Sequence, residues 1–286
     1  VGKILHIPVV HTFHGFHYED LHFLARKLHL AADIFLALIT DQHIFVSAGE
    51  KDRARVIKLF DENNSIVIHN GVDHEYLGSL SVSRNIVFKS IRCEDWKNKK
   101  ILGTISRLSP EKGILNLLSA FSKIIPIMAD LRLIIVGGCS PEYRDYHATV
   151  KGFIEQKNLT EHVRILGYQQ DAVKILKCMD FYVSSSLSEG LPISVLEACA
   201  SGIPTVATEI TGNKDILSNS IFGVLVKPNC SESLAGGIIK MIKLTKNERD
   251  TLIQNARERI KVHFSIDEMA LKTTLLYRKI LSKEVA

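Results

Sequence analysis

The feature that most constrains this fold is a repeated alternation of short β-branched runs with stretches of helical periodicity. The run 131–136 (LRLIIV) is rich in leucine, isoleucine and valine and ends at Gly137-Gly138. The stretch 113–128 places apolar residues at 114, 117, 118, 121, 124 and 125, which is the spacing of one helical face. This alternation predicts an α/β fold with parallel sheets and helices on both sheet faces.

The same alternation continues along the whole chain. Strands are expected at 9–13, 43–47, 66–69, 101–106, 131–136, 163–166, 181–184, 204–207 and 223–226. Helices are expected at 20–38, 50–60, 113–128, 231–262 with a break near Thr245, and 266–281. Parallel sheets bind ligands at the carboxyl ends of their strands, so the candidate functional residues are sought there.

The elements group into two units. Residues 74–100 are polar and predict a linker and the entry to the second unit. A complete α/β unit is expected at 84–262, after a partial unit at 1–83 and before a helix, 263–286, that crosses back to the first unit. Because the sequence begins with Val1 and the first unit has few strands, we expect it to be incomplete and to lack an N-terminal segment. The crossing helix would then have little to pack on.

Composition narrows the function classes. Hydrophobic residues make up 46% and charged residues 23% of the chain, which fits a folded protein and excludes a disordered one. A net charge of +5 fits an anionic substrate or membrane surface, but outside the run 97–100 the basic residues are scattered, so we expect no nucleic-acid partner. The longest apolar run, 34–39, is far shorter than the roughly 20 residues that span a bilayer, so membrane contact would be peripheral.

Cysteine usage indicates the compartment. The five cysteines are widely spaced and include no C-x-x-C pair. This spacing favours reduced thiols in a cytoplasmic protein over a zinc or redox site.

The first chemically informative strand end is the loop 106–113, SRLSPEKG. It holds Arg107 and Lys112 where a strand passes into a helix. A guanidinium and an ammonium at a helix N-terminus favour a diphosphate, although the G-K-[ST] element of a Walker loop is missing. Taken alone, these residues could equally be surface charges around a capped helix start.

The second strand end is the segment 186–198, SLSEGLPISVLEA. Glu189 follows a strand, Gly190 permits a tight turn, and Pro192 is a residue favoured in the first turn of a helix. Backbone N–H groups from Gly190 to Ile193 would face an anion or sugar hydroxyls. Glu197 follows Glu189 by eight residues, so one carboxylate would lie at the mouth of the site and the other deeper. The alternative is a capped core helix with two incidental acids.

These motifs resemble the large retaining glycosyltransferase family often called family 4, which has the GT-B fold of two Rossmann-like domains. The resemblance covers almost the whole chain and rests on SRLSPEKG, LIIVGG, VRILGY, SSLSEGLPISVLEACASGIPTVAT and FGVLVKP in the order of the family. The segments HTFHGFHY and IVIHNGVD resemble acceptor-domain elements of the family, and the chain is most similar to bacterial surface-polysaccharide enzymes.

The resemblance implies roles for individual residues. Arg107 and Lys112 would hold the donor pyrophosphate and neutralise charge as the nucleoside diphosphate leaves. Glu189 would contact the transferred sugar near its C3 hydroxyl, and Glu197 would accept hydrogen bonds from the ribose. His14 would touch the donor sugar from the acceptor side.

Further residues are implied to line the donor. The backbone around the sugar and phosphate would come from Gly190, Leu191, Ile193 and Ser194. Gly167 and Tyr168 would form part of the base pocket, with Gly138 on the same rim.

The resemblance also implies that the enzyme needs no metal and no cofactor. The spacing of His11, His14 and His17 fits no metal template well, and no D-x-D motif occurs. A front-face reaction is favoured, in which the leaving phosphate helps to deprotonate the acceptor hydroxyl.

We therefore expect a transferase that moves a hexose or N-acetylhexosamine from a nucleotide-sugar, UDP-linked by similarity, to a saccharide or lipid-linked acceptor. It would work in surface polysaccharide, lipopolysaccharide or capsule synthesis at the inner face of the cytoplasmic membrane. One alternative is a truncated fragment that binds the nucleotide-sugar without transferring it. A Rossmann oxidoreductase would need a G-x-G-x-x-G motif, which is absent, and a nucleotide-sugar epimerase gives no reason for the SRLSPEKG and E-x7-E pair.

Overall fold

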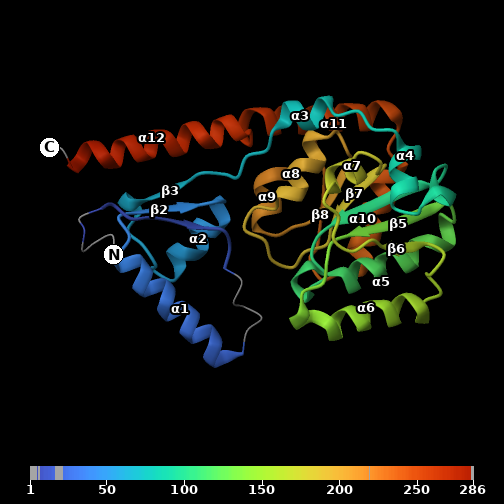
Figure 1. Ribbon diagram of the computed structural model, residues 1–286, viewed down its shortest axis with the longest axis horizontal. Helices are drawn as coiled ribbons and strands as arrows, with labels where there is room; N and C mark the ends of the chain where they lie inside the picture. The colour runs from blue at the N-terminus through green and yellow to red at the C-terminus, as the bar shows by residue number, and fades with distance from the viewer. Residues whose placement is uncertain (1–4, 6, 17–21, 219, 285–286) are drawn as a thin grey trace.

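The structure, a computed structural model, describes residues 5, 7–16, 22–218 and 220–284. Among these residues the strands form two separate parallel sheets, one of three strands and one of six (Figure 1). We call the three-stranded sheet with its helices the smaller unit and the six-stranded sheet with its helices the larger unit. The helix α12 (Ile266–Glu284) extends from the larger unit across the smaller one.

The smaller unit has strands on which alternate side chains point to opposite faces. Its elements are β1 (Val10–Phe13), α1 (Phe23–Leu38), β2 (Gln42–Phe45), α2 (Ala48–Val56) and β3 (Ser65–Val67), and the sheet order is β1-β2-β3. Phe13 and Phe45 stack at 5.0 Å on the face that α2 covers. Ile44 lies on the opposite face and packs with Leu276 of α12.

The larger unit reverses its strand order in the middle of the sheet. Its strands are β4 (Lys100–Ile105), β5 (Leu131–Val136), β6 (Val163–Ile165), β7 (Phe181–Ser184), β8 (Thr205–Thr208) and β9 (Val224–Val226), in the order β6-β5-β4-β7-β8-β9. The chain first builds outward from β4 through β5 to β6, then returns to β7 and builds the other way. A crevice for ligands is expected between the carboxyl ends of β4 and β7, where the order reverses.

Helices cover both faces of the larger sheet, as the alternation predicts. The helices are α5 (Ile114–Ile124), α6 (Arg144–Gln156), α7 (Ala172–Leu176), α8 (Ile193–Ala200), α9 (Thr211–Leu217), α10 (Ser231–Lys243) and α11 (Lys246–His263). One buried cluster lies under α5, α6 and α10, and the other lies under α7, α8 and α9. The predicted break near Thr245 is present, because Thr245 and Glu248 form a capping box that begins α11.

The prediction of a polar linker at 74–100 is wrong in one respect. This segment contains α3 (His74–Ser79), α4 (Arg84–Ser90) and a short 3-10 turn, and it carries buried side chains. Phe88 and Trp96 are buried in the core cluster of the larger unit. The segment is therefore packed against the larger unit, because a few apolar residues among many polar ones suffice to bury one side of a short helix.

The expectation that the C-terminal helix has little to pack on holds over most of its length, because Leu276 is the only buried side chain among its described residues 266–282. Leu276 is 6% exposed and packs with Ile44 and Ile68 of the smaller unit. The start of α12 is fixed by backbone hydrogen bonds, from Val72 N to Phe264 O at 2.9 Å and from Ile266 N to Val72 O at 3.0 Å. The helix therefore connects the two units along one side.

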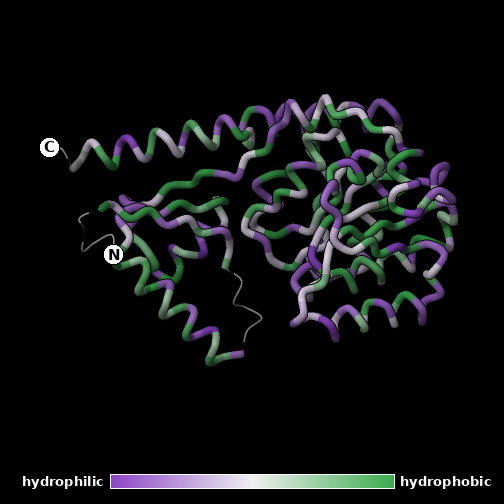
Figure 2. The backbone as a smooth tube through the Cα atoms, viewed as in Figure 1, coloured by the Kyte–Doolittle hydropathy of each residue, from purple (hydrophilic) through white to green (hydrophobic). Residues whose placement is uncertain are grey.

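The helix α1 has an unusually exposed apolar surface. None of its residues, all of which the structure describes, is buried, and Figure 2 shows hydrophobic residues along its length. Its large exposed apolar side chains include Phe23, Leu24, Leu28, Phe35 and Leu38. Within the described residues, no helix combines the length and the apolar character needed to cross a membrane.

Candidate functional site

The candidate site lies where the sheet order predicts it, at the carboxyl ends of β4 and β7. The loop after β4 (106–113) and the loop after β7 (185–192) are joined by hydrogen bonds. Leu187 N donates to Glu111 O at 2.7 Å, and Ser185 Oγ donates to Lys112 O at 2.8 Å. Gly113 has φ +62°, and a Cβ there would overlap the carbonyl oxygen of Ser185. A glycine is therefore needed for this close approach.

An ion pair occupies the centre of these two loops. Lys112 Nζ donates to Glu189 Oε1 at 2.7 Å, and the two side chains are only 11% and 15% exposed. Ser186 Oγ donates to the same carboxylate oxygen at 2.8 Å. The family resemblance predicts that Lys112 contacts the pyrophosphate and Glu189 the sugar, and the structure brings the two side chains into contact with each other.

Arg107 lies further out than Lys112. Its side chain is 62% exposed, and its Nη2 donates to Glu111 Oε1 at 3.3 Å. Ser109 Oγ donates to the same Glu111 oxygen at 2.5 Å. Arg107 therefore flanks the loop as a largely solvated guanidinium, held by a carboxylate four residues further along the chain.

The start of α8 supplies backbone donors beside the ion pair. The helix begins at Ile193, with Pro192 at its N-cap, and Val195 N donates back to Pro192 O at 3.2 Å. The N–H groups of Ile193 and Ser194 come before Val195 N, the first N–H of the helix with an intrahelical acceptor, so they can bind an anion. Glu197 follows one turn later, and burial raises the pKa of its carboxyl.

The smaller unit reaches the candidate site through the loop after β1. A Cβ at Gly190 would overlap the carbonyl oxygen of His14, so the backbones of the two units are in direct contact here. The His14 side chain is exposed. The backbone of His14 therefore meets the Glu189–Gly190 turn, while the contact of its side chain with the donor sugar stays a prediction. His17 lies outside the described residues. Across the part of the chain that the structure describes, no three His, Cys, Asp or Glu side chains are grouped as metal ligands.

The predicted base rim lies beside the first loop. Gly137 N donates to Gly167 O at 2.9 Å, and Leu108 N donates to Gly138 O at 2.9 Å. The position of a Cβ at Gly138 is 3.6 Å from Tyr168 Cβ. Tyr168 is 81% exposed, so its ring is free to stack on a planar group.

The sequence analysis missed several residues that hold the site. Thr211, at the start of α9, donates from Oγ1 to Glu189 O at 3.0 Å and lies 3.3 Å from Glu50 Oε1. Asn70 Nδ2 donates to Leu191 O at 3.1 Å from the smaller unit. Thr211 follows the carboxyl end of β8, so the strand-end rule could have found it. The contacts of Glu50 and Asn70 depend on how the two units dock.

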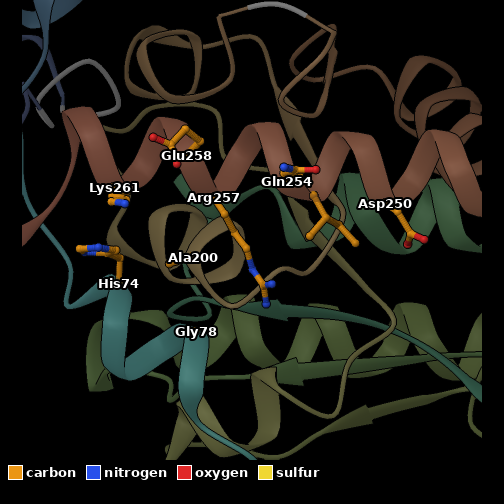
Figure 3. Close-up of a pocket in the computed structure, with 9 residues that line it drawn as sticks. His74, Gly78, Ala200, Asp250, Gln254, Arg257, Glu258 and Lys261 are labelled. Atoms are coloured by element: carbon orange, nitrogen blue, oxygen red, sulfur yellow. The ribbon is translucent and has the colours of Figure 1, made fainter.

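An open cavity of about 520 Å³ lies elsewhere, between α3 and α11 (Figure 3). Figure 3 shows His74 and Lys261 near each other at one end and Arg257 extending into its middle. Ala200, the last residue of α8, lines this cavity, whereas the candidate site is at the first residue of α8. We assign the site to the strand ends, because the loops and helix N-terminus with anion-binding chemistry converge there.

Comparison with known protein families shows which family the chain belongs to. The sequence model described as Glycosyl transferases group 1 matches residues 89–259, and that of Glycosyltransferase Family 4 matches residues 1–76. The chain belongs to the Glycosyl transferases group 1 family. The predicted resemblance to the family 4 glycosyltransferases is thereby confirmed.

Two curated relatives illustrate the range of the family. The chain is 27% identical over 280 residues to the UDP-Gal:alpha-D-GlcNAc-diphosphoundecaprenol alpha-1,3-galactosyltransferase of Escherichia coli, covering 96% of this chain and 70% of that protein. It is 29% identical over 241 residues to an uncharacterised glycosyltransferase of Methanocaldococcus jannaschii, covering 83% of this chain and 60% of that protein.

Solved structures establish the fold. The crystal structure of Anabaena HepE in complex with UDP and glucose matches with a TM-score of 0.86 at 22% identity, covering 97% of this chain and 73% of that chain. Sucrose-phosphate synthase from Thermosynechococcus elongatus matches with a TM-score of 0.84 at 22% identity, covering 99% and 71%. At such identities the likeness concerns the fold alone, and the predicted α/β GT-B fold with parallel sheets is confirmed.

Proposed function

We propose that this protein is a metal-independent, retaining glycosyltransferase. It moves a hexose or N-acetylhexosamine from a UDP-linked donor to a saccharide or lipid-linked acceptor. The observation that carries the proposal is the Lys112–Glu189 ion pair, with an Nζ to Oε1 distance of 2.7 Å, at the reversal point of the larger sheet. A partly buried cation and carboxylate beside a helix N-terminus offer separate partners for a phosphate and for sugar hydroxyls.

In this proposal the donor spans the carboxyl end of the larger sheet. Lys112, Arg107 and the first amides of α8 receive the pyrophosphate, and Glu189 accepts hydrogen bonds from the sugar. When the donor enters, Lys112 exchanges its contact with Glu189 for one with a phosphate oxygen. Glu197 faces the ribose, and the rim around Tyr168 holds the base.

The donor and acceptor classes are supported by relatives. The Escherichia coli relative is named for UDP-galactose and a diphosphoundecaprenol-linked acceptor. HepE has been crystallised with UDP and with UDP-glucose. We therefore propose a UDP-linked donor and an acceptor in the synthesis of surface polysaccharide, lipopolysaccharide or capsule.

The proposed mechanism is a front-face displacement with retention. In the donor complex the Glu189 carboxylate would keep the hydrogen bond from Ser186 and accept others from the sugar, which reduces its strength as a nucleophile. We infer that the leaving phosphate, not Glu189, receives the proton of the acceptor hydroxyl. Lys112, Arg107 and the N-terminus of α8 neutralise the charge that develops on that phosphate, the task that a metal ion performs in other transferases.

We further propose that the protein works at the inner face of the cytoplasmic membrane through peripheral contact. Support comes from the net charge of +5, the exposed apolar side chains of α1 and the lipid-linked acceptor of the Escherichia coli relative. Anionic headgroups attract a basic protein, and exposed apolar side chains add affinity for the interface.

Calorimetric binding of UDP, GDP and ADP, each with and without EDTA, tests the donor site. Of the three nucleotides, we expect only UDP to bind tightly, and we expect EDTA to leave its Kd unchanged. Lys112→Ala should weaken binding at least tenfold, because a charge-assisted hydrogen bond to phosphate is worth about 1.5–3 kcal/mol. Lys174→Ala is the control, since Lys174 pairs with Asp171 on an exposed helix surface. Absence of binding, or binding that EDTA abolishes, would contradict the proposal.

Turnover separates the transferase from a protein that only binds the donor. UDP-galactose, UDP-glucose and UDP-N-acetylglucosamine are supplied with a lipid-linked N-acetylglucosamine diphosphate. An α-linked product by NMR would establish retention, and a β-linked product would exclude it. UDP binding without product would favour the binding-only alternative.

A further inference from the structure

The buried carboxylate of Glu50 connects the two units next to the candidate site. Glu50 lies in the first turn of α2 and is 0% exposed. Its Oε2 accepts from Phe16 N at 3.0 Å, and its Oε1 accepts from Arg53 Nη1 at 3.2 Å. A carboxylate buried this completely is costly unless its lone pairs are satisfied, so these hydrogen bonds fix its position.

Thr211 brings this carboxylate into contact with the larger unit. Its Oγ1 lies 3.3 Å from Glu50 Oε1 and 3.0 Å from Glu189 O. A threonine hydroxyl has one proton, so it donates to one of these acceptors at a time. The Thr211 methyl group packs against α2, where a Cβ at Gly49 would lie 2.7 Å from Thr211 Cγ2. The starts of α2 and α9 are therefore in van der Waals contact around a shared hydroxyl.

The two ends of this connection are the loop after β1 and the loop after β7, which meet at the candidate site. On one side, Glu50 holds the amide of Phe16, two residues after His14. On the other, Thr211 holds the carbonyl of Glu189, immediately before Gly190. His14 O and Gly190 are themselves in contact with no room for a Cβ. A displacement of either loop would change how the smaller unit meets the sugar end of the donor.

We propose that Glu50 and Thr211 are positioning residues that set the separation between the His14 loop and the Glu189–Gly190 turn. The proposal rests on the transferase function proposed above. Neither side chain needs to touch the donor. Each acts through a backbone group of a loop that does, and misplacement of reacting groups by about 1 Å can cost roughly a hundredfold in rate.

Other contacts keep the units together when this connection is removed. Ala48 N donates to Asp215 Oδ2 at 2.7 Å, and His69 Nε2 lies 3.4 Å from the same oxygen. Asn70 also donates to Leu191 O. Loss of the Thr211 hydroxyl should therefore disturb the alignment of the two loops without separating the units.

Two substitutions at position 211 separate the hydroxyl from the methyl group. Thr211→Val keeps the shape and removes the proton donor, whereas Thr211→Ser keeps the donor and removes the methyl group. We expect Thr211→Val to lower kcat by roughly tenfold to a hundredfold while the UDP Kd stays within about threefold. Thr211→Ser should keep most of the wild-type kcat. Thr251→Val, on the exposed face of α11, is the remote control.

Hydrogen–deuterium exchange tests the connection without relying on activity. In Thr211→Val, amide exchange should rise both in a peptide covering 10–16 and in one covering 186–191, while a peptide covering 131–136 stays unchanged. Glu50→Gln should produce the same pattern, with its melting temperature measured alongside. A rise confined to 186–191, or an unchanged kcat in Thr211→Val, would overturn the proposal.

The two proposals can fail separately. If the wild-type chain binds UDP but transfers no sugar, the transferase function fails while the exchange pattern still decides whether Glu50 and Thr211 connect the loops. If transfer occurs and Thr211→Val is as active as the wild type, only the positioning role fails.

Discussion

Buried polar side chains in this protein are of two kinds, those whose hydrogen bonds are satisfied and those whose are not. Glu50 belongs to the first kind, because Phe16 N and Arg53 Nη1 donate to its carboxylate and the Thr211 hydroxyl lies 3.3 Å from its Oε1. His43 belongs to the second, because it is 0% exposed and neither ring nitrogen has a partner among the described residues. Satisfied groups such as Glu50 fix the positions of the loops around them. An unsatisfied titratable group such as His43 makes the stability of the fold depend on pH.

His43 should make the smaller unit labile in acid. Burial, with a smaller contribution from His11, lowers the pKa of His43 to about 4. Between that value and its ordinary pKa near 6.5, the unfolded chain binds a proton that the folded chain does not, so stability falls as pH decreases through this window. The full loss is about 3 kcal/mol.

Urea unfolding at pH 7.5, 6 and 4.5 measures this effect. His43→Leu should flatten the loss of unfolding free energy between pH 6.5 and 4, because the leucine cannot take up a proton. His263→Gln, at an exposed histidine, should leave the loss unchanged. Equal acid sensitivity in His43→Leu and the wild type would show that another group is responsible.

Gly190 should tolerate no side chain. A methyl group there would overlap the carbonyl oxygen of His14 and force the two loops apart. We expect Gly190→Ala to lower kcat by roughly a hundredfold or more. Gly152→Ala is the matched control, because nothing lies within 4 Å of its added Cβ in α6, and it should gain about 0.5–1 kcal/mol of stability. Near wild-type turnover in Gly190→Ala would argue against the close contact.

Among the elements, α12 stabilises the smaller unit from the face opposite to α2. Leu276 is 6% exposed and packs with Ile44 and Ile68, whereas its neighbour Leu275 is 54% exposed. Leu276→Ala should cost about 2–3 kcal/mol, the lower part of the range for core leucines because the cluster is small. Leu275→Ala should change stability by less than about 0.5 kcal/mol. Denaturant unfolding of both variants makes the comparison, and equal losses would mean that α12 does not pack as described.

Some elements could be predicted to the residue and others could not. The strands Leu131–Val136 and Phe181–Ser184 match their predicted bounds, because buried central strands are continuous apolar runs that end at polar or glycine residues. Short elements such as α3 and α4 were missed within a polar segment. A helix of six or seven residues has too few turns for its periodicity to stand out.

The site was predictable where it follows from sheet topology. Lys112, Glu189 and Gly190 meet because parallel strands deliver their following loops to one edge of the sheet. The contact between Glu50 and Thr211, 161 residues apart, depends on how the two units dock. No local pattern encodes such docking. The roles assigned to Glu197, Tyr168 and the other donor-lining residues stay predictions until a donor complex is examined.

At the scale of the whole molecule, each unit has its own core, and the boundary between the units combines hydrogen bonds with apolar contacts such as that of Val46. One cluster around Phe13 and Phe45 belongs to the smaller unit. Two larger clusters belong to the six-stranded unit, although one of them also includes Val46 of the smaller unit. The contacts between the units include those of Glu50, Asp215 and Asn70, which are hydrogen bonds. Because most buried apolar side chains lie in a cluster of their own unit, the two units are expected to unfold with limited cooperativity.

UDP should therefore stabilise one unit more than the other. The proposed donor site lies almost entirely on the larger unit, so UDP at about one hundred times its Kd should add about 2.7 kcal/mol to the stability of that unit. The smaller unit should gain only the part of this stabilisation that depends on its contacts with the larger unit. Leu276→Ala should have the opposite selectivity, because it should lower the unfolding temperature of the smaller unit alone.

The single tryptophan makes this difference measurable. Trp96 is buried in the larger unit, with the guanidinium carbon of Arg164 4.2 Å from its ring centroid, so its fluorescence reports the unfolding of that unit. Far-UV circular dichroism reports both units. With UDP the fluorescence transition should move to higher temperature while an earlier part of the dichroism transition stays in place. If both signals instead move together by the same amount, the boundary around Glu50 and Thr211 couples the units strongly enough for the chain to unfold as one body.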